Sequence, residues 1–292
     1  MPNAPVLEAV IAIAELLFLP ALLLMIAPML IRSANRNQPL LVILALFWLA
    51  DGWFLWGMHL EAPTVVRDAL LAALNLVLIL VTIIGGRIVP AFTRNALSQA
   101  GVQIALQPKP VVERLVIIVM LAVVVGDVVA AGSQLAAGLA AVAAGAHLWR
   151  QSGWHGWRTR SQPIVLILHL AYVWLPVGFA LKAAALGAGV GWAGFWQHAL
   201  GVGAAGTMIL AVMTRAALGH TGRPLQVHLS ITIAYLLLTL SVVMRVFGPY
   251  ALPLDYGTVI IFAGALWVGA FIPYLVIYGP ILLRPRIDGK PG

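Results

Sequence analysis

The chain has 292 residues, of which 62% are hydrophobic and 9% are charged, and its formal net charge is +8. This apolar share excludes an ordinary soluble domain and predicts a polytopic membrane protein. The sequence contains no cysteine, which excludes disulfides, thiolate metal sites and iron–sulfur clusters and leaves His, Met and carboxylates as metal ligands. The basic residues are spread over many segments and form no single patch, so the positive charge does not indicate nucleic-acid binding.

A membrane span needs about 20 consecutive apolar residues, and runs of that length recur along the whole chain. We therefore predict an all-α transmembrane helix bundle of nine spans. They are expected at residues 6–31, 39–60, 66–92, 111–130, 133–150, 163–185, 192–216, 224–247 and 256–283. Only AAGSQ separates the fourth span from the fifth. Residues 111–150 would form roughly 60 Å of helix, twice the hydrocarbon thickness, so a helical hairpin is favoured over one span.

The Lys and Arg residues differ sharply between the two sides of this predicted bundle. Only Arg67, Lys182 and Arg245 fall on one side, and all the others fall on the opposite side or in the C-terminal tail. Because cytoplasmic loops carry the excess of Lys and Arg, we expect the N-terminus outside and the C-terminus in the cytoplasm.

Two pairs of segments indicate an internal repeat. VPAFTRNALSQAG (89–101) aligns with LAVMTRAALGHTG (210–222), and RNQPLLVILAL (36–46) aligns with RSQPIVLILHL (160–170). The nearly equal offsets predict two parallel four-helix units, at about 6–130 and 133–247, followed by a final helix at 256–283. Together these parts would form a single transmembrane domain over residues 1–292.

The histidines fall into two layers of the predicted bundle. His59 and His198 lie toward the outside, whereas His169 and His220 lie toward the cytoplasm. The remaining histidines are expected near the inner interface and are assigned no role: His147, His155 and His228. A histidine inside a membrane is either a ligand or a hydrogen-bonding partner of a neighbouring helix.

The seventh span places His198, Met208 and Arg215 on one helix face, because they are separated by multiples of three and four residues. His198 and Met208 are roughly 15 Å apart along the axis, too far to bind one metal ion. The run GVGAAG (201–206) removes side-chain bulk beside His198. It indicates either close helix packing or room for a flat macrocycle.

Four further polar side chains lie within the outer half of the predicted spans: Glu15, Asp51, Asn75 and Asp127. They would suit a proton path or a metal site. Alternatively, each is satisfied by a neighbouring helix, and this second interpretation is favoured for Asp127.

At the cytoplasmic ends of spans three and seven, the two repeat copies place Arg87, Arg94 and Arg215 together with His220 and Arg223. A guanidinium binds carboxylates and phosphates with a planar fork of donors. Haem propionates, a phosphate and lipid headgroups are therefore all plausible partners of this cluster.

Several polar-rich motifs resemble the NnrS family. They are IGGRIVPAFTRNAL (84–97), LHLAYVWLPVG (168–178), HALGVGAAGTM (198–208), AVMTRAALGHTGRPL (211–225), RPRIDG near the C-terminus, and FLPALLL and NRNQP near the start. The resemblance implies a haem- and copper-containing protein of the bacterial cytoplasmic membrane that acts in nitric oxide metabolism and protection against nitrosative stress. The candidate cofactor-binding residues at matched positions are His59, His169, His198, Met208, His220, Arg87, Arg94 and Arg215.

The chain departs from the family pattern at its N-terminus. Typical members have about twelve spans and carry a GFRPFF segment and a His-Ala-His-Glu-Met motif in the first three, and neither motif is present here. The expectation is a short form that lacks these three helices. Such a form would either bind one cofactor fewer, or none, or complete its site with another copy or a partner membrane chain.

The leading hypothesis is a membrane protein that holds haem b, and copper as a second expected cofactor, with nitric oxide as its ligand. His59 and His198 would form an outer pair of metal ligands, and His169 and His220 an inner pair. Whether nitric oxide is turned over, so that the protein is an enzyme, is left open. One alternative is a transporter or channel for a small solute or metal ion, with a path lined by Glu15, Asp51, His59 and His198. Another is a non-catalytic membrane subunit.

Overall fold

The computed structural model describes residues 4–33, 38–103, 106 and 109–289. Within these ranges the chain is helical and contains no strand, so the predicted all-α class is confirmed. The long helices are α1 (Ala4–Arg32), α2 (Pro39–His59), α3 (Pro63–Gln99), α4 (Pro110–Val129), α5 (Gln134–Ser152), α6 (Pro163–Ala188), α9 (Leu229–Ala251) and α10 (Tyr256–Leu282). Between α6 and α9, one continuous helical stretch consists of the 3₁₀ turn η2 (Gly191–Phe195), α7 (Trp196–His198), the π-helix η3 (Ala199–Gly206) and α8 (Thr207–His220).

Each of the nine predicted segments corresponds to a helix, and seven of the helices in the described ranges are long and apolar enough to cross a membrane. The two below that threshold are α4, which carries Glu113, Arg114 and Asp127, and the alanine-rich α5. They are separate helices joined by a short turn, as the hairpin prediction requires.

Local sequence signals explain most helix boundaries. Four helices begin at a proline (α2, α3, α4 and α6), and the first helical position tolerates proline because its N–H has no intrahelical acceptor. Asp255 caps α10 by accepting hydrogen bonds from the backbone N–H and the hydroxyl of Thr258. These bonds hold the pKa of the Asp255 carboxyl below its usual range, so the cap is charged at neutral pH.

Two boundaries differ most from the prediction. Helix α9 begins at Leu229 and not at residue 224, and His228 caps it by accepting a hydrogen bond from the backbone N–H of Ser230. Helix α3 continues to Gln99, seven residues beyond the predicted end at 92. At 1.5 Å per residue its 37 residues are about 55 Å long, so it extends past a hydrocarbon core of about 30 Å.

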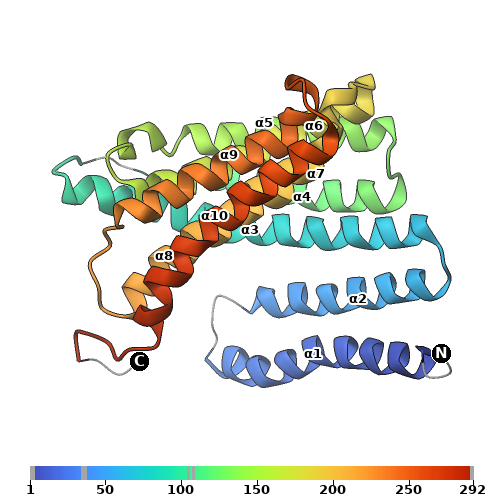
Figure 1. The fold of residues 1–292 in the computed structure, drawn as a ribbon, viewed down its shortest axis with the longest axis horizontal. Coiled ribbons are helices and arrows are strands. Elements are labelled where there is room, and N and C mark those ends of the chain that lie inside the picture. The colour runs from blue at the N-terminus through green and yellow to red at the C-terminus, as the bar shows by residue number, and fades with distance from the viewer. Residues whose placement is uncertain (1–3, 34–37, 104–105, 107–108, 290–292) are drawn as a thin grey trace. The chain divides into compact units, whose positions relative to one another are not determined.

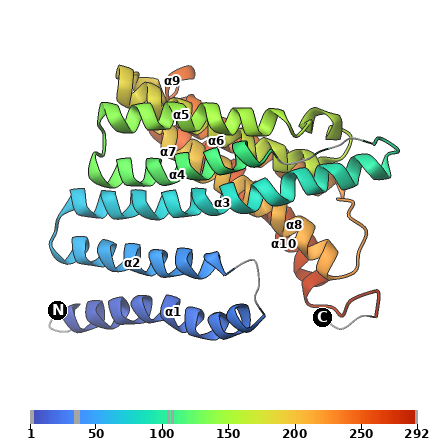
Figure 2. The ribbon, with the colours of Figure 1, turned by 180° about the vertical axis from the view of Figure 1, so that it is seen from behind.

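The chain divides into two compact units, 1–77 with 127–131 and 78–126 with 132–292. In the first unit, α1, α2 and the beginning of α3 lie side by side (Figures 1 and 2). The indole of Trp48 on α2 donates a hydrogen bond of 3.0 Å to the carbonyl of Leu16 on α1, which fixes the register of these two helices.

In the second unit, α6 is the central helix. It packs along α5 on one side and against η3 and α8 on another, whereas α9 packs along α10 (Figure 2). Most of the apolar segment of α6 is buried inside the protein. The side chains of α6 are therefore the ones around which polar groups of neighbouring helices can gather.

Candidate functional site

Arg150 is the centre of a buried polar network in the second unit. Its Nε donates to Glu113 on α4 at 2.9 Å, and its Nη2 forms an ion pair with the same carboxylate. Its Nη1 donates to the carbonyl of Thr82 on α3 at 2.7 Å and to the Tyr172 hydroxyl on α6 at 3.0 Å. Because the Arg150 side chain is only 3% exposed, these bonds compensate the cost of burying its charge.

Gly86 makes this arrangement possible. A Cβ added at Gly86 would overlap the guanidinium of Arg150, whereas a Cβ at the preceding Gly85 would make ordinary contacts of 3.4 Å with Met208 and Tyr172. The Gly-Gly pair of the IGGR motif therefore lets α3 and the Arg150 side chain approach closely.

His147 lies next to this network and is fully buried. Its Nδ1 is 2.9 Å from the hydroxyl of Tyr172, and its ring stacks on Phe179 with 5.8 Å between the centroids. Its Nε2 is buried and has no hydrogen-bond partner among the residues that the structure describes. The prediction that His147 lies near an interface without a role was therefore wrong about its surroundings, since the side chain turns inward from α5 toward α6.

His169, which the sequence singled out, is also buried. Its Nε2 is 2.7 Å from the hydroxyl of Thr93 on α3, and Trp154 lies edge-on to its ring. Its Nδ1 has no hydrogen-bond partner, but a Cβ at Gly156 would approach Nδ1 to 2.5 Å. The unpartnered nitrogen of His169 is thus closed in by backbone.

The GVGAAG run forms the π-helix η3, which begins directly after His198. A Cβ at Gly203 would lie 2.7 Å from Trp174 on α6, so close helix packing explains this glycine. His198 is half-buried, and its ring lies 6.2 Å from that of Phe195. The π-helix is a departure from regular geometry that is frequent at functional sites.

The other predicted site residues lie in different surroundings. His59 is exposed at the end of α2 in the first unit, and His220 is exposed at the end of α8 in the second. Met208 is buried beside Gly85. The pairing of His59 with His198 and of His169 with His220 stays a prediction. Among the residues that the structure describes, no group of three or more His, Asp or Glu side chains could hold a metal ion.

The three predicted arginines differ in exposure. Arg87 and Arg94 are exposed on α3, and Arg94 donates to the carbonyl of Leu106 at 3.4 Å. Arg215 is half-buried on α8, with its guanidinium 3.7 Å from the ring centroid of Phe92 on α3. Within the described residues Arg215 forms no ion pair, and its partial burial suits it to binding an added anionic group.

Two of the polar-rich motifs contact each other. In the C-terminal tail, Arg286 donates to the carbonyl of His220 at 2.9 Å, and the N–H of Ile287 donates to the carbonyl of Thr221 at 3.3 Å. Arg286 also forms an ion pair with Asp288 at 2.6 Å. The GHTGRP turn after α8 is therefore the docking point of the RPRIDG tail.

Substitution of Gly222 by alanine is expected to release this tail. Its φ of +73° is strained for any residue with a Cβ, and that Cβ would lie 2.6 Å from Cγ of Asp288. Trypsin should then cut the Arg286–Ile287 bond several-fold faster than in the wild type, as followed by mass spectrometry. Gly219→Ala is the matched control, because a Cβ there would lie 4.0 Å from its nearest neighbour. Equal cleavage rates in the two variants would contradict this role of the turn.

The predicted carboxylates differ in their surroundings. Asp127 accepts a hydrogen bond of 2.8 Å from Asn75, which confirms that a neighbouring helix satisfies it. Glu15 and Asp51 line one open cavity of the first unit.

The residues that sequence reasoning missed are Glu113, His147 and Arg150. The i, i+3 spacing of His147 and Arg150 was a signal for these two residues, because it places both polar side chains on one face of α5. No spacing pointed to Glu113.

The fold and this network define a polytopic, all-α membrane protein with a buried core of imidazole, phenol and guanidinium groups. The chain belongs to the NnrS family, because the family described as NnrS protein matches residues 2–286. Together with the apolar helices, this membership points to a bacterial membrane protein. No curated protein and no solved structure matched the chain.

Proposed function

We propose that this protein binds haem in the second unit and acts in nitric oxide metabolism or protection against nitrosative stress. The observation that carries the proposal is the hydrogen bonding of the two ring nitrogens of His147. Its Nε2 is buried without a partner while its Nδ1 is held by Tyr172. A histidine that ligates a metal usually has its second ring nitrogen fixed by a hydrogen bond in this way.

The donor set suits haem better than it suits a site made by several protein ligands. Haem iron needs one or two imidazoles from the protein, whereas a bare copper ion in a cysteine-free protein needs several converging His, Met or carboxylate groups. His147 would supply the imidazole, and Arg215 would supply a cation for a propionate. When bound, haem would supply an iron centre that can take up nitric oxide.

The protein residues around His147 would control its orientation and protonation. The Tyr172 hydroxyl accepts a hydrogen bond from Arg150, so its own proton can be donated to Nδ1 of His147. That arrangement would leave the proton of the neutral imidazole on Nε2. Ligation through Nε2 therefore requires the opposite orientation, in which Nδ1–H donates to the Tyr172 oxygen. Haem binding would select this tautomer.

The first test is cofactor content. The full chain, produced with ample haem supply and purified in detergent, is expected to carry about one haem per chain and one iron by elemental analysis. Protein that is folded by size-exclusion chromatography yet has no haem absorption and no iron would overturn the proposal.

A further inference from the structure

A cavity of the first unit is formed by one face each of α1, α2 and α3. It has a volume of about 730 Å³. On α2 the lining residues Phe47, Asp51 and Phe54 are separated by four and three residues, and on α1 Glu15 is followed three residues later by Phe18. These steps put side chains on one helix face, so all five project into the same space.

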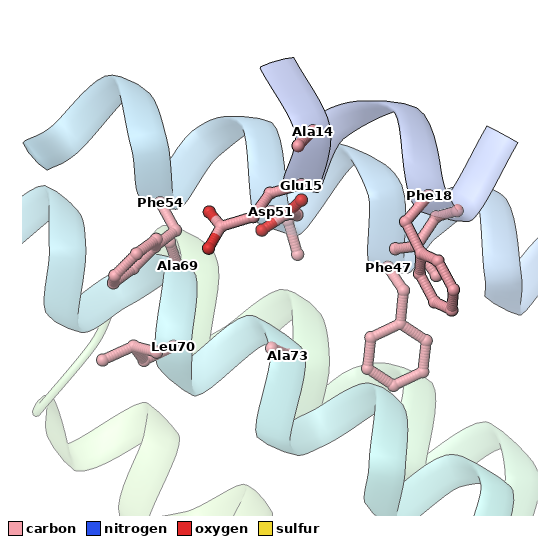
Figure 3. Close-up of a pocket in the computed structure, with 11 residues that line it drawn as sticks. Ala14, Glu15, Phe18, Phe47, Asp51, Phe54, Ala69, Leu70 and Ala73 are labelled. Atoms are coloured by element: carbon pink, nitrogen blue, oxygen red, sulfur yellow. The ribbon is translucent and has the colours of Figure 1, made fainter. Parts of the chain in front are cut away.

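Two carboxyl groups lie at the middle of this cavity. Figure 3 shows Glu15 and Asp51 reaching it from α1 and α2, with Phe54 on one side and Phe18 and Phe47 on the other. Each carboxyl lies inside an apolar helix that is long enough to span a membrane, with Asp51 near the middle of Pro39–His59 and Glu15 nearer the start of Ala9–Arg32. Neither forms a hydrogen bond or an ion pair with any residue that the structure describes.

Carboxyl groups at that depth need a compensating partner, because the hydrocarbon region does not solvate charge. The first unit offers none of its own. Of its described basic residues, Arg67 pairs with Asp68 at 2.9 Å, and Arg32 is at the far end of α1. The partner is therefore expected to be a cation from outside the first unit.

The other residues that line the cavity indicate which kind of cation it can bind. Apart from Glu15 and Asp51, the cavity is lined only by Phe, Leu and Ala side chains, which offer no ligand to an inorganic ion beyond the two carboxylates. Hard divalent ions take six or more oxygen ligands. Aromatic faces attract organic cations such as quaternary ammonium groups, and a space of this size accommodates a small organic molecule.

From this juxtaposition we infer that the Glu15–Asp51 cavity is a binding site for a monovalent organic cation with an apolar body. The charge lies between the two carboxylates, and the apolar groups contact the three phenylalanine rings. The site lies in the first unit, whereas the haem proposed above would be held by residues of the second.

Tetraphenylphosphonium tests this site, because it joins one positive charge to four aromatic rings. Binding of the radiolabelled ion to the detergent-purified full chain is measured by equilibrium dialysis, with protein-free micelles as the blank. Saturable binding of one ion per chain is expected. Glu15→Gln and Asp51→Asn should each weaken it at least about tenfold. Asp68→Asn, an exchange in the same unit but outside the cavity, should leave it unchanged.

Tetraphenylborate has the same shape and the opposite charge, so it separates charge recognition from simple partition into an apolar groove. The inference predicts no saturable binding of this anion by the wild type. Equal binding of both ions, unaltered affinity of the Glu15 and Asp51 variants, or no binding above the blank would each overturn it. Phe47→Leu provides a second variant that keeps both charges and removes one ring, and it is expected to weaken binding several-fold.

Discussion

Replacing Gly86 by alanine is expected to lower the apparent melting temperature of the detergent-solubilised protein by roughly 10 °C. The new Cβ would occupy the position of the Arg150 guanidinium, which would then lose Thr82, Tyr172 and its geometry toward Glu113. Breaking a buried ion pair while its charges stay buried costs about 3–5 kcal/mol in free energy of unfolding. Fluorescence-detected size-exclusion chromatography after heating measures the change.

The neighbouring glycine supplies the control for this experiment. Gly85→Ala adds the same methyl group to the same helix at ordinary contact distance, and we expect a change of about 2 °C at most. In an Arg150→Met background the clashing group is absent, so Gly86→Ala should then cost far less. If Gly86→Ala and Gly85→Ala have the same melting temperature, the Arg150 guanidinium does not lie against Gly86.

The second large effect is expected at His147. His147→Gly should reduce bound haem at least about tenfold, because it removes the proposed iron ligand. Millimolar imidazole added to this variant should restore haem binding by entering the vacated space, as read from the optical spectrum. His147→Met, which keeps a ligand able to bind haem iron, should retain haem with an altered spectrum.

His155→Gly is the matched control for these variants. His155 is exposed in the loop after α5, and its φ of +51° favours glycine. The variant should therefore fold and keep its haem. An unchanged spectrum in both His147→Gly and His147→Met would remove His147 from the site and direct attention to His169 and His198.

The helices could be predicted from sequence because hydrophobic run length and prolines determine where spans begin and end. Pro39, Pro63, Pro110 and Pro163 each begin a helix at or within three residues of the expected position. The satisfaction of Asp127 by a neighbour was also predictable, since an interfacial carboxylate usually finds a partner. The extension of α3 beyond residue 92 was not, because residues 93–99 are mostly polar and the length of a hydrophobic run does not include them.

The polar network could not be predicted, because it depends on tertiary contacts. Arg150 lies near the end of α5, where a basic residue is typical of a cytoplasmic boundary. In the structure it turns inward, since Gly86 on α3 leaves room for the guanidinium and Glu113 on α4 supplies the opposite charge. None of these three positions is close to another in sequence, so spacing alone carries no sign of their contact.

The central claim is that the protein presents haem iron to nitric oxide. The most direct measurement is an anaerobic titration of the reduced, purified protein with nitric oxide, followed by its optical spectrum. We predict a saturating spectral change that is complete at about one nitric oxide per haem. A haem spectrum that does not respond to nitric oxide, or a folded protein with no haem spectrum at all, would contradict the claim.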